Sequence, residues 1–194
     1  RNHQSLPHIV SSHSIPHILF ENHLFQNLVT LPPYVVLVRD IRATLVSNYE
    51  KWKEHYACDF DDFLRGDISG HRFNNDIWWC FRFCNRWGYL AENFPDGTLI
   101  VKYEDLAKNP LPELQRICRH WQLQLDDSAL SYAINESSKE KMSQKKDPDT
   151  PFGVTVVRDN NKSYREWYNE EQNRYLSNIT KSFLSYDFDY NYMS

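Results

Sequence analysis

The pattern of apolar positions changes its period in the middle of the segment YVVLVRDIRATLVSNY, residues 34–49. The unbroken apolar and aromatic run from Tyr34 to Val38 is rich in β-branched residues and is typical of a strand buried in a parallel sheet. Arg39 and Asp40 end this run. Beyond them the apolar residues recur at helical spacing, at Ile41, Leu45, Val46 and Tyr49. The pattern predicts a strand that turns directly into a helix, which continues to about His55.

Similar patterns alternate along the rest of the chain. Thr98 to Tyr103 (TLIVKY) predicts a second buried strand, and His8 to Ser12 (HIVSS) predicts a short strand with His13 at its end. Helical periods and capping residues predict helices at 20–28, 59–64, 76–92, 112–121, 126–135 and 169–184. Strands that alternate with helices favour an α/β fold with a mostly parallel sheet, and 194 residues suit a single domain over 1–194.

The spacing of Arg39 and Ser47 suggests an anion site. In open α/β sheets ligands bind beyond the carboxyl ends of the strands, where Arg39 is expected. Ser47 follows eight residues later, about two helical turns along the next helix. An Arg fork and a Ser hydroxyl are both donors to phosphate oxygens. Alternatively, Arg39 pairs with a surface carboxylate and Ser47 is an ordinary helix residue, and the spacing alone favours this second interpretation.

Composition excludes several classes of protein. A formal net charge of −4 argues against a general nucleic-acid-binding protein, because such proteins carry a basic surplus. No apolar run approaches the length of about 18 residues that suggests a membrane-spanning helix, so we expect no membrane partner for the chain as given. The N-terminal residues RNHQSLPH lack the apolar core of a signal peptide.

The cysteines indicate a reducing compartment. Cys58, Cys80, Cys84 and Cys118 have no zinc-site spacing, which predicts buried free thiols and no metal site. Cytoplasmic localisation is the default expectation. A catalytic domain of the Golgi lumen, cut from its membrane anchor, would have the same sequence features.

The segment RDIRATLVSNY resembles the 3'-phosphate-binding segment of the sulfotransferases that use 3'-phosphoadenosine 5'-phosphosulfate (PAPS), close to R-D-P-R-D-x-x-x-S. This resemblance implies that Arg39 and Ser47 bind the 3'-phosphate of the nucleotide. Ile41 replaces the usual Pro of the pattern, and Ala43 replaces its second Asp.

Two further segments resemble the same family. SHSIP is similar to K-T-H-x-P, which implies that His13 is the general base that takes the proton from the acceptor hydroxyl. Ser11 stands in place of the Lys, and one extra residue precedes Pro16. VKYEDL resembles the Y-E-D-L segment, which implies that Tyr103 lies beside the adenine. Glu104 is then expected to be structural, as is Asp105.

The C-terminal third also resembles the family. SSKEKMSQ is similar to T-S-F-x-x-M, which implies that Ser137 and Ser138 contact the nucleotide, although Lys139 stands where a Phe is usual. VVRDNNKSY is similar to R-K-G-x-x-G-D-W, with Arg158 as the phosphate-binding Arg and Asp159 and Asn160 in place of Lys-Gly.

One element of the family pattern is absent. No string like K-S-G-T-T, the loop that wraps the 5'-phosphosulfate, occurs before His13. We therefore expect a P-loop NTPase-like three-layer α/β fold whose N-terminal strand and loop are missing. Either an upstream segment was removed, or the protein binds its ligand without that loop.

The resemblance implies transfer of a sulfonate group from PAPS, the co-substrate, to a hydroxyl or amine acceptor, giving 3',5'-ADP. No metal is required, because the donor is already activated. The first alternative is an inactive sulfotransferase-like fragment that binds a nucleotide or a partner, and the second is a divergent nucleotide kinase. The sequence indicates neither the class of acceptor nor the oligomeric state.

Overall fold

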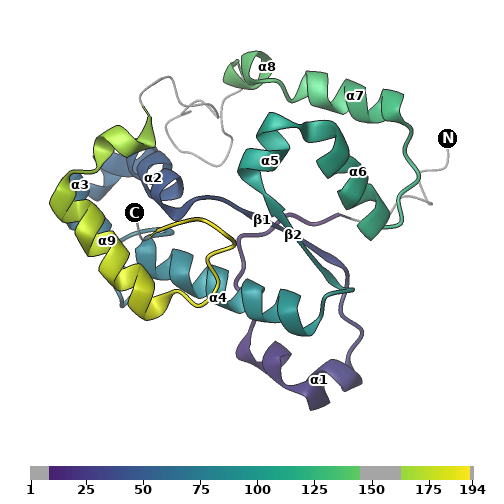
Figure 1. Ribbon diagram of the computed structural model, residues 1–194, viewed down its shortest axis with the longest axis horizontal. Coiled ribbons are helices and arrows are strands. Elements are labelled where there is room, and N and C mark those ends of the chain that lie inside the picture. Colours follow the sequence, from purple (N-terminus) through teal and green to yellow (C-terminus); the bar gives the residue numbers. More distant parts are fainter. Residues whose placement is uncertain (1–8, 145–162, 193–194) are drawn as a thin grey trace.

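The computed structural model describes residues 9–144 and 163–192 (Figure 1). The elements along these residues are η2 (Ile18–Glu21), α1 (His23–Leu28), β1 (Tyr34–Val38), α2 (Ile41–Tyr56), α3 (Phe60–Arg65), α4 (Ile77–Asn93), β2 (Thr98–Lys102), α5 (Tyr103–Lys108), α6 (Pro110–His120), α7 (Asp127–Glu136), α8 (Lys139–Ser143), η3 (Tyr164–Trp167) and α9 (Glu170–Phe183). The predicted α/β class is confirmed.

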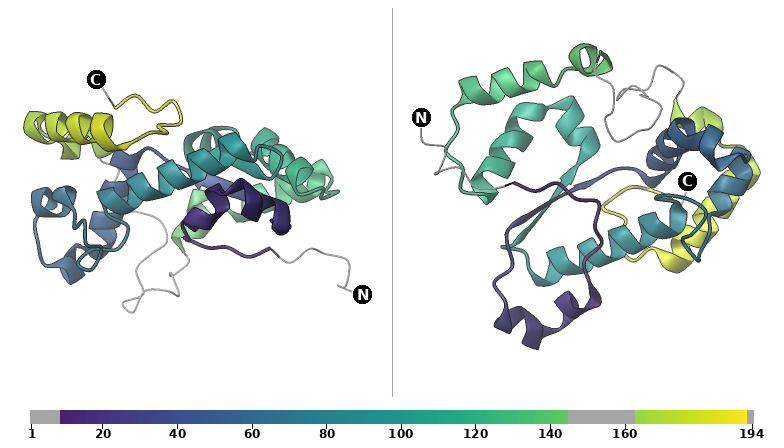
Figure 2. Two further views of the ribbon diagram at one scale, coloured as in Figure 1. Left: turned by 90° about the horizontal axis from the view of Figure 1, so that it is seen from below. Right: turned by 180° about the vertical axis from the view of Figure 1, so that it is seen from behind.

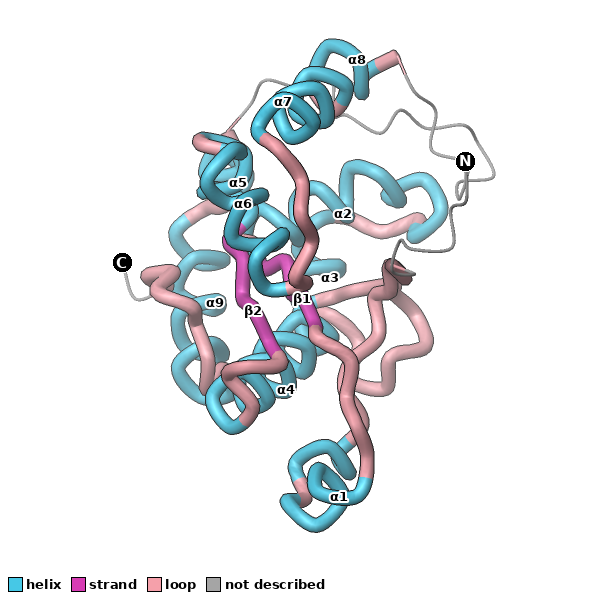
Figure 3. Tube along the Cα trace, turned by 90° about the vertical axis from the view of Figure 1, so that its right-hand side faces the viewer, coloured by secondary structure: helices cyan, strands magenta, loops and turns pink. Residues whose placement is uncertain are grey.

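The two described strands form a parallel pair at the centre of the molecule (Figure 3). Their register pairs Tyr34 with Thr98 at one end and Val38 with Lys102 at the other. Because the pairing is not staggered, both strands end at the same level. The residues that follow them, Arg39 and Tyr103, therefore leave the sheet side by side.

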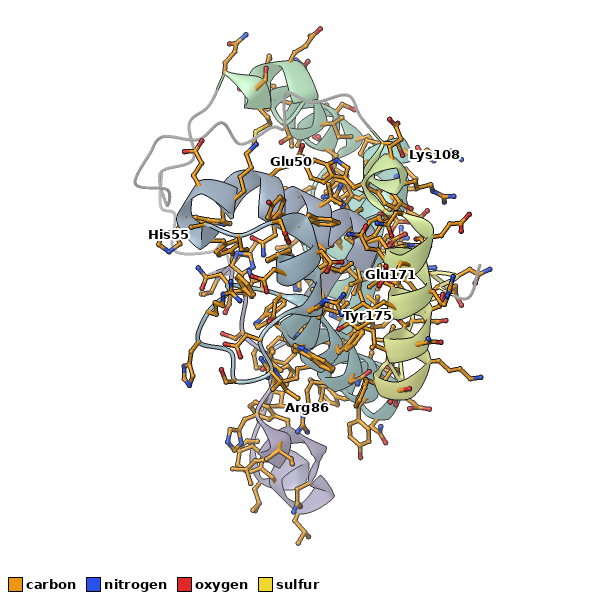
Figure 4. The ribbon with its side chains drawn as sticks, turned by 90° about the vertical axis from the view of Figure 1, so that its left-hand side faces the viewer. Glu50, His55, Arg86, Lys108, Glu171 and Tyr175 are labelled. Atoms are coloured by element: carbon orange, nitrogen blue, oxygen red, sulfur yellow. The ribbon has the colours of Figure 1, made fainter. Side chains whose placement is uncertain are left out.

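Helices surround this pair of strands. α4 packs along one side of the sheet, α5 and α6 lie on the other, and α2, α3 and α9 gather near the carboxyl ends of the strands (Figure 1). The turned view in Figure 2 shows α4 crossing the molecule with α9 on one side of it. Helix α9 carries the labelled Glu171 and Tyr175 in Figure 4, and the Tyr175 hydroxyl donates to the Arg65 carbonyl of α3 at 3.5 Å.

The hydrophobic core lies mainly between α2, α3 and α4. Its most buried side chains have no measurable exposure and include Leu45, Val46, Phe63 and Ile77. Phe63 stacks on Tyr56 with ring centroids 5.3 Å apart and meets Phe73 edge to face at 5.2 Å. Burying a side chain of this size contributes about 1.5–3 kcal/mol. The aromatic richness of the sequence is thus used largely for packing.

Most predicted elements are found within a residue or two of their expected bounds. Asp59 caps α3 with its side chain, and Gly66 ends that helix at a φ of +69°. Strand β2 ends one residue earlier than predicted, because Tyr103 already begins α5. The predicted helix at 20–28 is divided, since Asn22 ends η2 and caps α1 through the amides of Leu24 and Phe25.

The predicted N-terminal strand is wrong over the residues that can be compared. His8 lies outside the described residues, and residues 9–12 have no regular structure. Only Ile9 and Val10 of this segment are apolar, and both are exposed, at 59% and 84%. A strand gains stability by burying one face, and these side chains bury little surface.

The four cysteines are free thiols, as predicted. Cys80, Cys84 and Cys118 are buried, whereas Cys58 is half-buried. Burial raises the pKa of the Cys84 thiol to about 12. Within residues 9–144 and 163–192, no group of three or more His, Cys, Asp or Glu side chains could hold a metal ion. No helix of the described chain is long and apolar enough to cross a membrane.

Gly88 provides a test of the packing against α4. A Cβ atom at Gly88 would overlap ring carbons of Tyr186, which follows α9. Alanine inside a helix is normally preferred over glycine by about 1 kcal/mol. At Gly88 we expect alanine to destabilise the protein instead, because its Cβ atom would overpack the contact with Tyr186. Unfolding in urea should show that Gly88→Ala lowers the free energy of unfolding by about 1–3 kcal/mol.

The control for this prediction is Gly88→Ala made in a Tyr186→Gly background, because the Cβ atom of Tyr186 would overlap the new side chain as its ring does. With that whole side chain removed, the alanine should regain its ordinary helical preference and raise the free energy of unfolding relative to the Tyr186→Gly protein. Stabilisation by Gly88→Ala in the otherwise unchanged protein would contradict the packing described for α4.

Candidate functional site

Arg39 and Tyr103 form the centre of the candidate site. The Arg39 guanidinium carbon lies 4.6 Å from the centroid of the Tyr103 ring, a cation–π contact. This contact follows from the register, since each residue comes directly after the last residue of its strand. Arg39 is half-buried, and Tyr103 keeps 40% of its surface exposed. One face of the ring meets the cation, and much of its surface remains open to solvent.

The Arg39 side chain holds an unsatisfied donor. Its Nε atom is buried and has no hydrogen-bond partner among the residues that the structure describes. Arg39 also forms no ion pair with a carboxylate of those residues, so the described structure does not show the alternative interpretation of a surface salt bridge. A buried donor without an acceptor costs about 1–3 kcal/mol.

Ser47 lies on α2, half-buried, one turn beyond the buried Ala43. Its position is about 9 Å along the helix axis from Ile41, at 1.5 Å per residue. No hydrogen bond joins Ser47 to Arg39, whose side chain is turned toward Tyr103. That Arg39 and Ser47 bind the same phosphate stays a prediction.

Asp40 organises the turn between β1 and α2. It is 5% exposed and caps α2 by accepting a hydrogen bond from the Arg42 amide at 2.9 Å. Its carboxylate also forms an ion pair with the Arg42 guanidinium at 2.8 Å. Burial acts to lower the pKa of Arg42, but the hydrogen bond and charge of Asp40 outweigh it, so the pKa is raised. Asp40 thereby neutralises the charge of Arg42 within the fold, whereas no carboxylate of the described residues neutralises the charge of Arg39.

Tyrosine hydroxyls surround the same turn. Tyr164 donates to the Asp40 carboxylate at 2.9 Å, and Tyr168 donates to the Arg42 carbonyl at 2.8 Å. The Ile41 amide donates to the Tyr192 hydroxyl at 3.1 Å. Burial raises the pKa of both Tyr168 and Tyr192, which keeps these hydroxyls neutral.

Glu104 connects the ends of the two strands. One of its carboxylate oxygens accepts from the Asp40 amide at 3.4 Å, and the other accepts a short hydrogen bond from the Tyr190 hydroxyl. Beside it, Lys102 forms an ion pair with Asp189 at 2.9 Å. These contacts agree with the structural role expected for Glu104. No local pattern predicted that tyrosines complete this network, although the Tyr-rich string YDFDYNY contains two of them, Tyr190 and Tyr192.

The His13 side chain is exposed. The adjacent Ser14 carbonyl accepts a hydrogen bond from the Trp87 indole at 3.2 Å, and Trp87 packs on the Tyr34 ring with centroids 5.1 Å apart. Tyr34 begins β1, whereas Arg39 follows its end. No hydrogen bond or ring contact of the described chain joins His13 to Arg39, and its catalytic role stays a prediction.

Ser137 and Ser138 form no hydrogen bond with the Arg39–Tyr103 pair in the part of the chain that the structure describes. Ser137 ends α7 and is exposed, and Ser138 precedes α8 and is half-buried. Arg158 lies outside the described residues. The site that the structure defines is therefore a cation and an aromatic ring at the carboxyl ends of two parallel strands. This pairing suits a ligand that carries both an anion and a flat ring, as a nucleotide does.

The chain belongs to the family described as "Sulfotransferase domain", whose model matches residues 1–181. Among curated proteins, it is 26% identical over 140 residues to Sulfotransferase 2A1 of Rattus norvegicus. That match covers 71% of this chain and 47% of the relative, so the chain spans about half the length of the curated protein.

Solved structures of low sequence identity share the fold. Mouse sulfotransferase SULT7A1 complexed with PAP has a TM-score of 0.64 and 15% identity, and the match covers 81% of this chain and 59% of that one. Retinol dehydratase in complex with androsterone and inactive cofactor PAP also has a TM-score of 0.64, at 17% identity, over 82% of this chain and 49% of that one. The fold is thus the P-loop-like α/β fold of sulfotransferases.

Proposed function

We propose that this sulfotransferase domain transfers a sulfonate group from PAPS to a hydroxyl or amine acceptor and releases 3',5'-ADP (PAP). The observation that carries the proposal is the Arg39 guanidinium, held against Tyr103 with its Nε buried and unsatisfied among the described residues. Membership of the sulfotransferase family supports it, as do relatives of the same fold that were solved with PAP.

The nucleotide would be held by side chains at the strand ends. Arg39 presents a planar fork of donors to a phosphate group. The Tyr103 ring fixes the plane of that fork, which reduces the rotamer entropy lost on binding. Ser47 would add a hydroxyl donor from α2. Ser137, Ser138 and Arg158 are proposed as further nucleotide contacts on the family pattern.

The proposed catalytic base is His13. Its exposed imidazole can accept the proton of an attacking hydroxyl and later release it. PAPS supplies a sulfonate that is already activated for transfer. The protein's tasks are to orient the nucleotide through Arg39 and Ser47 and to receive the acceptor proton.

A binding function without transfer is the second candidate. It rests on the same Arg39–Tyr103 pair, which would hold a nucleotide whether or not a sulfonate group is transferred. For localisation we propose the cytoplasm, because its reducing conditions suit four free thiols, with the Golgi lumen as the alternative.

Replacement of Arg39 tests the nucleotide site. We expect the unchanged protein to bind 3',5'-ADP with micromolar affinity in titration calorimetry. Arg39→Ala should weaken binding about 10- to 100-fold, because hydrogen bonds to a charged group contribute about 1.5–3 kcal/mol. Arg39→Lys should fall between the two, since it keeps the charge and loses the fork.

The matched control is Arg82→Ala, which removes an exposed cation from α4 and should leave the affinity unchanged. Equal affinity of the Arg39→Ala variant and the unchanged protein for 3',5'-ADP would refute the proposed nucleotide site.

Replacement of His13 tests catalysis separately from binding. With radiolabelled PAPS and two simple acceptors, 4-nitrophenol and ethanolamine, His13→Ala should lower the rate of sulfonate transfer about 10²- to 10⁴-fold. Its affinity for 3',5'-ADP should not change, because His13 has no contact with Arg39 or Tyr103. The exposed His71 provides the control variant His71→Ala, which should retain full activity.

Two results would count against this assignment of roles. Unchanged transfer by His13→Ala would exclude His13 as the base. Tight binding of 3',5'-ADP by a protein that transfers no sulfonate to either acceptor would favour the binding function over the enzyme.

A further inference from the structure

The segment that follows α9 returns to the candidate site. Residues 184–192, called the tail below, run from the end of α9 past α4 to the turn between β1 and α2 (yellow in Figures 1 and 2). Tyr186 meets α4 through a short hydrogen bond to Glu92. Further along, Tyr190 and Tyr192 reach the ends of the two strands. The tail thus joins elements that are distant in sequence.

Tyr192 is fixed at both of its ends. It is 6% exposed, and its hydroxyl accepts from the Ile41 amide, the first residue of α2. Its carbonyl accepts from the Ser177 hydroxyl of α9 at 2.6 Å. The Arg42 guanidinium carbon lies 5.1 Å from the centroid of its ring. This side chain therefore links α9 to the first turn of α2.

The contact with Ile41 has a consequence for ligand binding. The first amides of a helix have no partner within the helix and commonly bind anions. In α2 the Ile41 amide is taken by Tyr192, and the Arg42 amide by Asp40. An anion at this turn would then be bound by side chains such as Arg39 rather than by these two amides.

Tyr190 acts on the same turn through Glu104. Its hydroxyl donates to one Glu104 oxygen while the other oxygen accepts from the Asp40 amide. Burial first, and then the hydrogen bond to Glu104, raise the pKa of Tyr190 and keep its hydroxyl a donor. Two neighbouring backbone amides are therefore held by groups of the tail or by groups that the tail fixes. The Ile41 amide is held by Tyr192, and the Asp40 amide is held by Glu104, which Tyr190 contacts.

We propose that Tyr190 and Tyr192 are positioning residues for nucleotide binding. The Tyr192 hydroxyl holds the Ile41 amide directly, and the Tyr190 hydroxyl holds the Asp40 amide through Glu104. This backbone follows Arg39 directly and sets where its guanidinium lies relative to Tyr103. The inference rests on the proposed function, and it adds that the affinity for the nucleotide depends on groups that do not touch it.

The experiment compares three tail variants that each lose one hydroxyl and keep the ring: Tyr192→Phe, Tyr190→Phe and Tyr186→Phe. Titration calorimetry with 3',5'-ADP, well below the melting temperature, should show about three- to tenfold weaker binding for the first two, the effect of one lost hydrogen bond. Tyr186→Phe loses a comparable hydrogen bond on the same segment, to Glu92, and should bind as the unchanged protein does.

A second measurement follows the turn itself. Hydrogen exchange of the Ile41 amide should accelerate in Tyr192→Phe and stay unchanged in Tyr186→Phe, because the first variant removes the acceptor of that amide. Unchanged exchange in Tyr192→Phe would overturn the inference, since the hydroxyl would then not be holding the turn.

The outcomes separate this inference from the proposed function. If Arg39→Ala abolishes binding of 3',5'-ADP while Tyr190→Phe and Tyr192→Phe bind as tightly as Tyr186→Phe, the positioning role is overturned and the nucleotide site stands. If the unchanged protein does not bind 3',5'-ADP, both fail. Weaker binding by all three tail variants equally would also overturn the inference, because it would reflect a general loss of order in the tail.

Discussion

The parallel register of β1 and β2 is the constraint on which the rest of the structure depends. The two strands are paired without a stagger, from Tyr34 with Thr98 to Val38 with Lys102. Side chains that follow parallel strands meet only if the strands end at the same level. A shift of one residue would move Arg39 away from Tyr103 and Asp40 away from Glu104. The register is thus the origin of both the cation–π contact and the Asp40–Glu104 hydrogen bond.

Asp40 turns this arrangement of strands into a rigid site. Its side chain caps α2 and neutralises the charge of Arg42, and it also accepts a hydrogen bond from the Tyr164 hydroxyl. Removal of one partner from a buried ion pair commonly costs about 3–5 kcal/mol, so the turn resists rearrangement. Arg39 stands beside this turn and has no carboxylate partner among the described residues. Of the two neighbouring arginines, Arg42 is thus paired with Asp40 within the fold, and Arg39 is available to a ligand.

Local patterns along the chain predicted much of this fold. The apolar run before Arg39 gave β1, and the caps Asp59 and Asn169 marked the starts of α3 and α9. Contacts between distant segments could not be predicted in this way. Tyr192 meets Ile41 across about 150 positions of sequence, and no local period encodes such a pairing. For the same reason, the local pattern HIVSS suggested a strand, although Ile9 and Val10 are exposed and residues 9–12 pair with no strand of the described chain.

We propose that Arg39 recognises a phosphate on the ribose of the nucleotide. This role is tested by titration calorimetry of the unchanged protein with 3',5'-ADP and with 5'-AMP, which lacks the 3'-phosphate. We expect 3',5'-ADP to bind at least about tenfold more tightly, because only that ligand offers the Arg39 fork a 3'-phosphate. We also expect Arg39→Ala to remove this difference. Equal affinity of the unchanged protein for the two nucleotides would exclude this role of Arg39.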